Sequence, residues 1–561
     1  MKFEIARDSV SLCGIWCDKG MEKAAEQLSL YLEKITGGEY SVITERTGQR
    51  FEILFDESVK YFSYEIDSEK FMIVAPDVIY AGWGVFHLLE NVAGCVFCTS
   101  SYEVIPKKPS LTLETDKYVH DQPFENNYVY YRDFMDNPLF AMKNGMCLMG
   151  YSKDDCKTYY SEESKWTAHT LGSMMLNYEK YKDHPEYFCM KNGERVKPEY
   201  SDESLGLGGE IYIQNLQPCL SNPDVFEIVC DELQRYMDER PDVKVWNISQ
   251  SDSLNYCECP ECAKIDEEEG SHVGTYLRFV NKVAARFPDK FINTLAYQFS
   301  KTPCKLTKPA DNVGIVLCNF EAFRDKPIVE DPDNEVIKND LVGWRKLTNN
   351  IFYWDYCIEF PHLISPFPNF RSIAANMRFF AEGGIRTLFS QCNREVLGEF
   401  AELRAYYIAK LAANPYDDPN AIIEKFCNAY YGKAAPYIIE YINIMHDALE
   451  NSEAKLWIGD NPIKASEHYL SYDLYEKYVE LFDKAEMQVS DNSEIFNHVR
   501  LARMPLYYAG LVIGYGDKKS RLDILAKFTK TAQDNNIDMV HELGKDTLRK
   551  FVVDTAAQLA E

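Results

Sequence analysis

Apolar residues in the middle of this chain occur in short continuous runs, and three of these runs end on a carboxylate. Residues 243–252 read VKVWNISQSD, residues 313–321 read VGIVLCNFE, and residues 350–355 read NIFYWD. A run without polar alternation is typical of a strand that is buried on both faces of a parallel sheet. These segments therefore predict three strands of such a sheet.

Strands and helices alternate on both sides of these runs. We expect strands at residues 128–131, 145–150, 211–216, 243–249, 291–297, 313–318, 351–354 and 387–391. Helical periodicity lies between them, for example at residues 224–236 and 274–286. This alternation predicts an α/β fold with a (β/α)8 TIM barrel at residues 116–400.

The two ends of the chain follow different patterns. Residues 1–115 combine helical periodicity at 21–35 and 79–92, the second followed by Gly94 as a stop, with apolar runs at 51–55 and 71–75. This combination predicts a small N-terminal α/β domain. From residue 401 the strand-like runs stop, and amphipathic helices predict a C-terminal α-helical domain at 401–561.

Charge and cysteine content limit the partners and the compartment. The formal net charge of −28 argues against nucleic acid and anionic membranes as partners. The 17 cysteines are odd in number and scattered, unlike the paired framework of a small secreted domain. No signal-peptide pattern and no run long enough to span a bilayer is visible. We therefore expect a soluble, cytoplasmic protein, with oligomerisation left open.

Carboxylates at the ends of the predicted strands are the first candidates for chemistry. In a (β/α)8 barrel the active site lies at the carboxyl ends of the strands, so Asp252, Glu321 and Asp355 would converge on one pocket. Hydrolysis of a glycosidic bond needs an acid that protonates the leaving oxygen and a second carboxylate that acts as base or nucleophile. We assign the acid to Asp252 and leave Glu321 and Asp355 for the second role. Each could instead cap the helix after its strand.

Polar and aromatic residues near the same strand ends are candidates for substrate binding. Asn247 and Gln250 could bind sugar hydroxyls, His169 a carboxylate or hydroxyl, and Arg132 a negative group. The residues that could form a sugar platform are Trp166, Tyr297, Gln298, Trp354 and Tyr356. Internal hydrogen bonds, a salt bridge at Arg132 and core packing of the rings are the alternatives.

A compact cysteine motif follows Asp252. Cys257, Cys259 and Cys262 form a C-x-C-x2-C pattern, which suits a soft metal such as a structural Zn²⁺. A closed site needs a fourth ligand, and His272 is the nearest histidine. Inert reduced thiols or a local disulfide are the alternatives. A metal here would brace the loop that carries Asp252.

Several motifs in order resemble a known bacterial family. The segment NISQSDSLNYCECPECAKIDEEEG, then TLAYQ at 294–298, FYWDY at 352–356 and FPNFR at 367–371 resemble domain-of-unknown-function family 4838, as does EFAELRAYYIAKLAANPYDD at 399–418. Residues 79–97 (IYAGWGVFHLLENVAGCVF) are similar to the N-terminal domain of family 67 α-glucuronidases. The resemblance implies a glycosidase-like barrel with a helical C-terminal domain.

Together these observations predict a glycoside hydrolase that acts on a glycan terminus. The terminal sugar would be a uronic acid or an N-acetylhexosamine, and no cofactor would be needed for catalysis. A non-catalytic carbohydrate-binding protein on a glycosidase-like barrel is the alternative.

Overall fold

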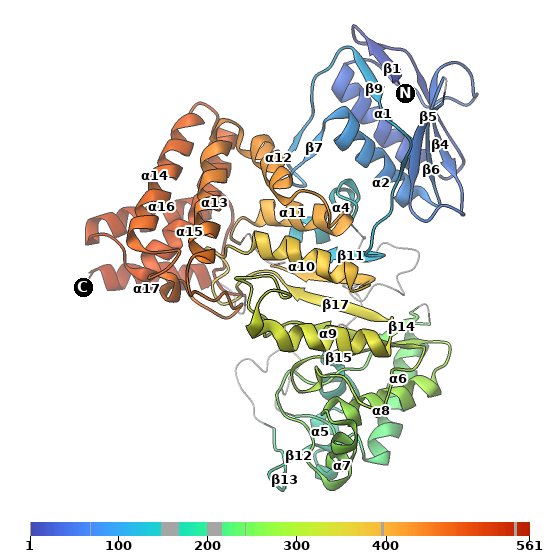
Figure 1. Ribbon diagram of the computed structural model, residues 1–561, viewed down its shortest axis with the longest axis vertical. Helices are drawn as coiled ribbons and strands as arrows, with labels where there is room; N and C mark the ends of the chain where they lie inside the picture. Colours follow the sequence, from blue (N-terminus) through green and yellow to red (C-terminus); the bar gives the residue numbers. More distant parts are fainter. Residues whose placement is uncertain are drawn as a thin grey trace.

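The computed structural model describes residues 2–67, 69–146, 168–198, 216–241, 243–393, 398–542 and 547–560. It is a mixed α/β structure in which an N-terminal sheet unit, a central parallel sheet and a set of C-terminal helices follow one another (Figure 1). In the view of Figure 1 the N-terminal unit lies above the central sheet and the C-terminal helices lie to its left. Among the described residues, none of the helices combines the length and apolar character that crossing a bilayer requires.

The N-terminal unit contains a mixed sheet and two covering helices. The sheet has the strand order β10-β5-β6-β4-β3, and a second sheet has the order β2-β1-β9. These strands are β1 (Lys2–Arg7), β2 (Val10–Ser11), β3 (Gly14–Cys17), β4 (Arg50–Phe55), β5 (Ser63–Asp67), β6 (Lys70–Ala75), β9 (Leu111–Glu114) and β10 (Tyr118–Val119). The strands predicted at 51–55 and 71–75 are thus confirmed.

Helix α1 (Glu22–Thr36) confirms the helix predicted at 21–35. The segment predicted as a helix at 79–92 forms α2 (Val78–Leu88) and continues as a π-helical turn, Leu89–Ala93. It ends at Gly94, whose φ of 91° lies in the left-handed region that favours glycine. A short hairpin, β7 (Val96–Phe97) with β8 (Glu103–Val104), follows.

The central sheet consists of parallel strands in the order β11-β18-β17-β16-β15-β14. The strands are β11 (Asn126–Val129), β14 (Val245–Asn247), β15 (Phe291–Ala296), β16 (Val313–Cys318), β17 (Ile351–Tyr356) and β18 (Thr387–Gln391). Every residue of β16 and β17 is buried, as expected for continuous apolar runs. The first strand, β11, pairs with the last, β18. Most of the strands predicted at 145–150 and 211–216 lies outside the described residues.

Helices follow the strands of the central sheet, as the alternation predicted. The main ones are α6 (Pro223–Glu239), α7 (Pro260–Glu269), α8 (Val273–Arg286), α9 (Glu335–Leu347) and α10 (Phe370–Glu382). Short elements in this part of the chain are α3 (Arg132–Met135), α4 (Pro138–Lys143), α5 (Tyr178–Tyr181), β12 (Met190–Lys191) and β13 (Glu194–Arg195).

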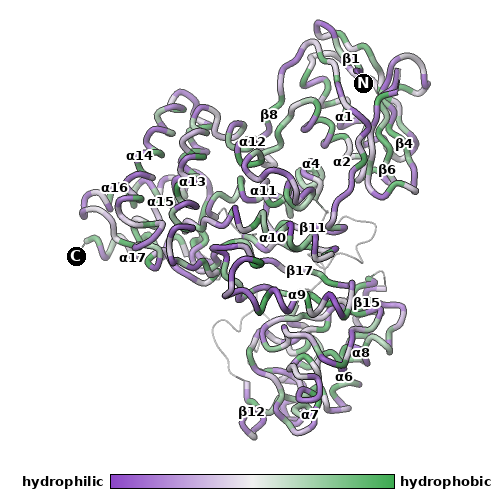
Figure 2. The backbone as a smooth tube through the Cα atoms, viewed as in Figure 1, coloured by the Kyte–Doolittle hydropathy of each residue, from purple (hydrophilic) through white to green (hydrophobic). Residues whose placement is uncertain are grey.

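Beyond the sheet, the described chain is helical. The helices are α11 (Ala401–Ala413), α12 (Pro419–Tyr431), α13 (Ala435–Glu450), α14 (Tyr472–Gln488), α15 (Ser493–Ile513), α16 (Lys518–Asp534) and α17 (Thr547–Ala560). Figure 2 shows hydrophilic and hydrophobic residues interleaved along them, as expected for amphipathic helices that pack on one another.

A buried charge cluster ties the N-terminal unit to the C-terminal helices. Glu90, from the turn after α2, accepts hydrogen bonds from the Tyr406 hydroxyl at 2.7 Å and from the Lys425 ammonium at 2.9 Å, and also pairs with Lys410. Burial works against ionisation of Glu90, but the charges of Lys410 and Lys425 outweigh it and lower its pKa to about 2. These contacts join segments far apart in the sequence.

Candidate active site

A cavity of about 450 Å³ opens at the carboxyl ends of the central strands. Residues from the ends of β15, β16, β17 and β18 line one part of it, and residues from the C-terminal region line the other. Its lining includes His169, Asp252, Tyr297, Phe320, Trp354, Tyr356, Gln391, Trp457 and Glu542. The structure therefore brings five of the candidate residues, His169, Asp252, Tyr297, Trp354 and Tyr356, to one place.

Asp252 follows β14 and is held by two side chains that follow β15. The Tyr297 hydroxyl donates to its Oδ1 at 3.1 Å, and the Gln298 amide donates to the same oxygen at 3.2 Å. Gln298 has a φ of 51°, which is costly for a residue other than glycine. This unfavourable backbone conformation occurs at the residue whose side-chain amide donates to Asp252.

His169 is a second residue with left-handed backbone at this cavity, with a φ of 57°. Its Nδ1 lies 2.8 Å from the carbonyl oxygen of Gln250, so Nδ1 carries the proton and Nε2 is the acceptor in the neutral ring. Burial lowers the pKa of His169, and the nearby charge of Asp252 opposes this effect. His169 and Asp252 thus form an electrostatically linked pair.

Three other polar candidates have different surroundings. The Gln250 amide donates to the Tyr297 carbonyl at 3.1 Å and to the Ser300 hydroxyl at 2.7 Å, so it braces the loop after β15. Asn247 is buried and accepts a hydrogen bond from the Ser249 hydroxyl. Arg132, at the start of α3, is more than half exposed and lies 4.0 Å from Asp136. These three do not line the cavity, and Trp166 lies outside the described residues.

An aromatic wall comes from alternate residues of β17. The rings of Trp354 and Tyr356 stack with their centroids 5.9 Å apart and an interplanar angle of 17°. The Trp354 indole donates to the Gln391 side chain at 2.7 Å, which fixes its orientation. Phe320 packs edge to face against Tyr356, and Trp457 packs edge to face against Phe320. Such a surface can stack against the apolar face of a sugar ring.

The strand alternation that turns Trp354 and Tyr356 toward the cavity turns Asp355 away from it. Asp355 is buried and accepts a hydrogen bond from the Asn319 amide at 2.6 Å. Burial raises its pKa, while Arg324 acts in the opposite direction. Asp355 does not line the cavity, so it does not meet Asp252 there.

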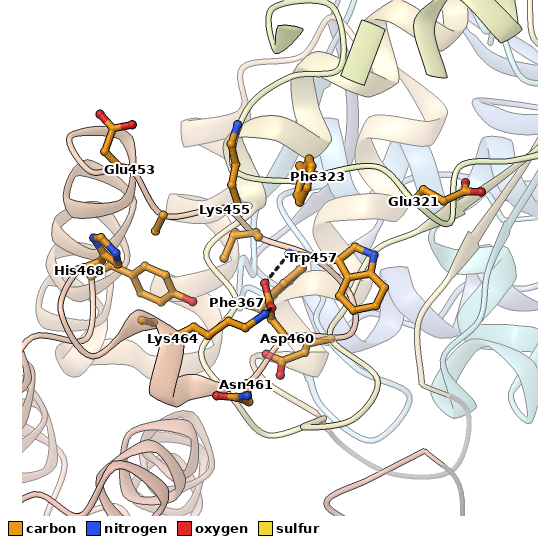
Figure 3. Close-up of a pocket in the computed structure, with 15 residues that line it drawn as sticks. Glu321, Phe323, Phe367, Glu453, Lys455, Trp457, Asp460, Asn461, Lys464 and His468 are labelled. Carbon is orange, nitrogen blue, oxygen red and sulfur yellow. Dashed lines mark hydrogen bonds and ion pairs between the residues drawn. The ribbon is translucent and has the colours of Figure 1, made fainter. Parts of the chain in front are cut away.

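Glu321 lines a separate, adjoining cavity of about 440 Å³ between the strand ends and the C-terminal helices. Figure 3 shows Glu321 at the opposite end of this second cavity from Glu453 and His468. Its half-exposed carboxylate pairs with Lys301 at 3.1 Å. Trp457 lines both cavities and stands where they meet. The expected convergence of Asp252, Glu321 and Asp355 on one pocket is therefore not what the structure presents.

Glu542 is a carboxyl group that the sequence did not single out. It comes from the C-terminal region, and its backbone N–H donates to the Phe360 carbonyl at 3.1 Å. Burial raises the pKa of Glu542 to about 7, with a hydrogen bond to the Gln391 side chain acting against the shift. Among the described residues that line the first cavity, Asp252 and Glu542 are the carboxyl groups. No local pattern marks Glu542, because its position depends on how the C-terminal segment packs.

The cysteines of the C-x-C-x2-C motif do not line this cavity, and the structure adds a fourth cysteine to them. Cys219, from the loop before α6, joins Cys257, Cys259 and Cys262, and the four sulfur atoms lie within 4.8 Å of one another. His272 instead stacks on Tyr256, with ring centroids 3.7 Å apart, and its Nδ1 forms a hydrogen bond with the Asp266 carboxylate. The buried thiol cluster could hold a metal ion, with Cys219 rather than His272 as the fourth ligand.

The comparisons with known proteins agree with this architecture. The profile of the family described as "Domain of unknown function (DUF4838)" matches residues 97–443. The chain therefore belongs to this family, as its motifs indicated. The search of curated proteins finds no match.

Solved glycoside hydrolases share the fold. A family 115 4-O-methyl-α-glucuronidase with specificity for decorated arabinogalactans is 11% identical with a TM-score of 0.53, and the match covers 98% of this chain and 80% of that one. A family 89 glycoside hydrolase from Clostridium perfringens, in complex with GlcNAc-α-1,4-galactose, is 13% identical with a TM-score of 0.50. That match covers 91% of this chain and 65% of the other. At these identities the likeness establishes a glycosidase-like fold.

Proposed function

We propose that this protein is a glycoside hydrolase that removes a terminal sugar from a glycan. The observation that carries the proposal is the cavity at the strand ends, where Asp252 and Glu542 share an aromatic-walled space. Two carboxyl groups beside a sugar-sized site are the equipment that glycosidic hydrolysis requires. The cavity volume of about 450 Å³ is in the usual range for a small-molecule site.

The environments of the two carboxyl groups suggest their roles. Glu542 has a pKa raised to about 7 by burial, so a large fraction stays protonated near neutral pH and can protonate the leaving oxygen. Asp252 accepts two hydrogen bonds and lies beside His169, an environment that suits a carboxylate acting as base or nucleophile. This assignment gives Asp252 the second role and moves the acid from Asp252 to Glu542.

The substrate we propose ends in a uronic acid or an N-acetylhexosamine. The stacked rings of Trp354 and Tyr356 would bind one face of the sugar, and His169 would donate or accept at a polar substituent. The likeness to a 4-O-methyl-α-glucuronidase and to an enzyme bound to a GlcNAc-containing disaccharide supports these two sugar classes. We further propose that the pairing of β11 with β18 closes a full (β/α)8 barrel at 116–400, flanked by domains at 1–115 and 401–561.

A leaving-group series tests the proposal and the roles together. The purified chain is assayed on glucuronides and N-acetylhexosaminides with either a dinitrophenyl or an alkyl leaving group. Glu542→Gln should lose about 10²–10⁴-fold on alkyl glycosides and keep most activity on dinitrophenyl glycosides, which need no protonation. Asp252→Asn should lose both activities.

Glu321→Gln is the matched control, because it removes a carboxyl group from the adjoining cavity. It should leave kcat/KM within about threefold of wild type, which is under 1 kcal/mol. If Asp252→Asn keeps activity on dinitrophenyl glycosides and Glu542→Gln loses activity on both substrates, the acid role returns to Asp252. Sugar binding without turnover on every substrate would favour the non-catalytic carbohydrate-binding alternative.

A further inference from the structure

We propose that Cys219, Cys257, Cys259 and Cys262 form a structural zinc site with four thiolate ligands. All four side chains are buried, and their sulfur atoms lie within 4.8 Å of one another. The Cys219 and Cys259 sulfurs are 3.6 Å apart. A tetrahedral ion with Zn–S bonds of about 2.3 Å places its sulfur ligands about 3.8 Å from one another, and the sulfur separations in the cluster, none above 4.8 Å, leave room for such an ion.

Hydrogen-bond donors surround the sulfur atoms as they do in metal–thiolate centres. The backbone N–H of Met190 donates to the Cys257 sulfur at 3.4 Å, and the Arg195 guanidinium lies 3.9 Å from the same atom. The Ser221 hydroxyl lies 3.1 Å from the Cys262 sulfur and 3.5 Å from the Cys219 and Cys259 sulfurs. A Zn²⁺ ion with four thiolates carries a net charge of −2, and these donors and the arginine offset that charge.

The local sequence also prepares the ligands. Cys259 is the residue before α7, and Pro260 occupies the first helical position, where its missing N–H costs nothing. Cys262 lies in the first turn of the same helix. The positive end of a helix dipole stabilises thiolates over thiols, which favours metal ligation.

A closed set of four sulfur ligands leaves no position for substrate or water, so the metal would act by holding the structure together. The cluster joins the loop before α6 to the segment between β14 and α7. The hairpin of β12 and β13 packs on the same site, since Glu258 N–H donates to the Met190 carbonyl at 2.8 Å. The four cysteines thus cross-link two segments at one point, and hydrogen bonds through Met190 hold the hairpin against them.

Metal analysis of the full chain tests this site without any assay of activity. The protein is purified with reductant and without chelator, and zinc is measured by mass spectrometry and X-ray absorption. We expect one zinc per chain with four sulfur neighbours at about 2.3 Å. Nitrogen in the coordination shell, zinc absent after growth in zinc-supplemented medium, or a mass lower by two hydrogens per disulfide would overturn the proposal.

Two cysteine variants separate ligation from burial. Cys219→Ala should lose at least tenfold in zinc occupancy under dilute chelator. Cys189→Ala is the matched control, because Cys189 is equally buried in the same apolar cluster and is not one of the four grouped sulfurs. It should retain one zinc per chain, and equal zinc loss in both variants would count against the assignment. If Cys219→Ala does not fold, the number of sulfur neighbours of zinc in the wild-type protein still tests the proposed site. Because these readouts are metal content, they stand or fall independently of the proposed hydrolysis.

Discussion

The side-chain amide of Gln217 binds both backbone polar groups of Ser251. Its Nε2 donates to the Ser251 carbonyl at 2.8 Å, and its Oε1 accepts from the Ser251 N–H at 3.0 Å. Gln217 stands two residues before Cys219, and Ser251 stands one residue before Asp252. This pair of hydrogen bonds therefore connects the thiol cluster to the cavity.

Gln217→Ala should lower turnover while leaving zinc in place. The substitution removes both hydrogen bonds to Ser251, so the position of Asp252 becomes less defined, and we expect kcat to fall about tenfold with a small change in KM. Steady-state kinetics and metal content, measured on the same preparation, check this. Gln217→Glu keeps the acceptor oxygen but loses the N–H donor, so its kcat should lie between those of the wild type and the alanine variant. An alanine variant with unchanged kcat would contradict the positioning role of Gln217.

Tyr297→Phe should reduce activity through Asp252. The hydroxyl removed here donates to Oδ1 at 3.1 Å, and a hydrogen bond to a charged group contributes about 1.5–3 kcal/mol, or roughly 10–150-fold in kcat/KM. Tyr472→Phe is the matched control, since it also removes a hydrogen bond between a tyrosine and a carboxylate, to Glu476 on the exposed face of α14. That variant should keep wild-type kinetics. Equal kinetics for the two variants would contradict a contribution of the Tyr297 hydroxyl to activity.

The pH dependence of hydrolysis should follow the protonation of Glu542. Because burial raises the pKa of this carboxyl to about 7, and because the acid must be protonated to act, kcat/KM should fall as pH rises above about 7. In Glu542→Gln this alkaline limb should disappear from the residual activity on alkyl glycosides, whereas dinitrophenyl glycosides, which need no protonation, should show no such limb in either protein. An unchanged alkaline limb in the variant would show that another group controls it.

Asp355 and Glu321, the two carboxylates predicted beside Asp252, should differ in their contribution to stability. Asp355→Asn alters a buried group that bonds Asn319, and we expect the free energy of unfolding to fall by about 1–3 kcal/mol. Glu321→Gln alters a half-exposed group and should change it by less than about 0.5 kcal/mol. Denaturant unfolding measures both. A stable, correctly folded Asp355→Asn that has lost all turnover would instead favour a catalytic role for Asp355.

Glu90 should contribute strongly to stability above acidic pH. Its pKa of about 2 lies below the ordinary value of about 4.3 in an unfolded chain, so its contribution is complete above about pH 4.3 and is lost as pH falls toward 2. Glu90→Gln leaves Lys410 and Lys425 without their shared partner and should cost about 3 kcal/mol.

Glu480→Gln is the control for Glu90, because its partner Lys484 lies on the same exposed helix face. This variant should change stability by less than about 0.5 kcal/mol. Thermal or denaturant unfolding at pH 7 and pH 3 checks both variants. A Glu90→Gln variant that is as stable as the control at pH 7 would contradict the ion-pair argument.

The sequence by itself located most strands of the central sheet that the structure describes and several residues of the candidate cavity. Continuous apolar runs predicted β16 and β17, and the strand expected at 291–297 is found as β15. Tyr297 after β15 and Trp354 and Tyr356 of β17 reach a shared cavity because parallel strands end at one edge. The spacing of Cys257, Cys259 and Cys262 also marked the thiol cluster, since three ligands in one short segment must lie close together. Local patterns suffice wherever the partners are near in sequence or on neighbouring strands.

Only the tertiary structure decided which polar groups meet. Strand β17 runs to Tyr356, beyond the end predicted at Trp354, so Asp355 lies within the strand and the period-two alternation turns it away from the cavity. Cys219 joins the thiol cluster and Glu542 joins Asp252 from loops that no periodic pattern describes. Contacts between distant segments depend on how whole elements pack, and a single sequence records only the tendency of each segment to form its own element.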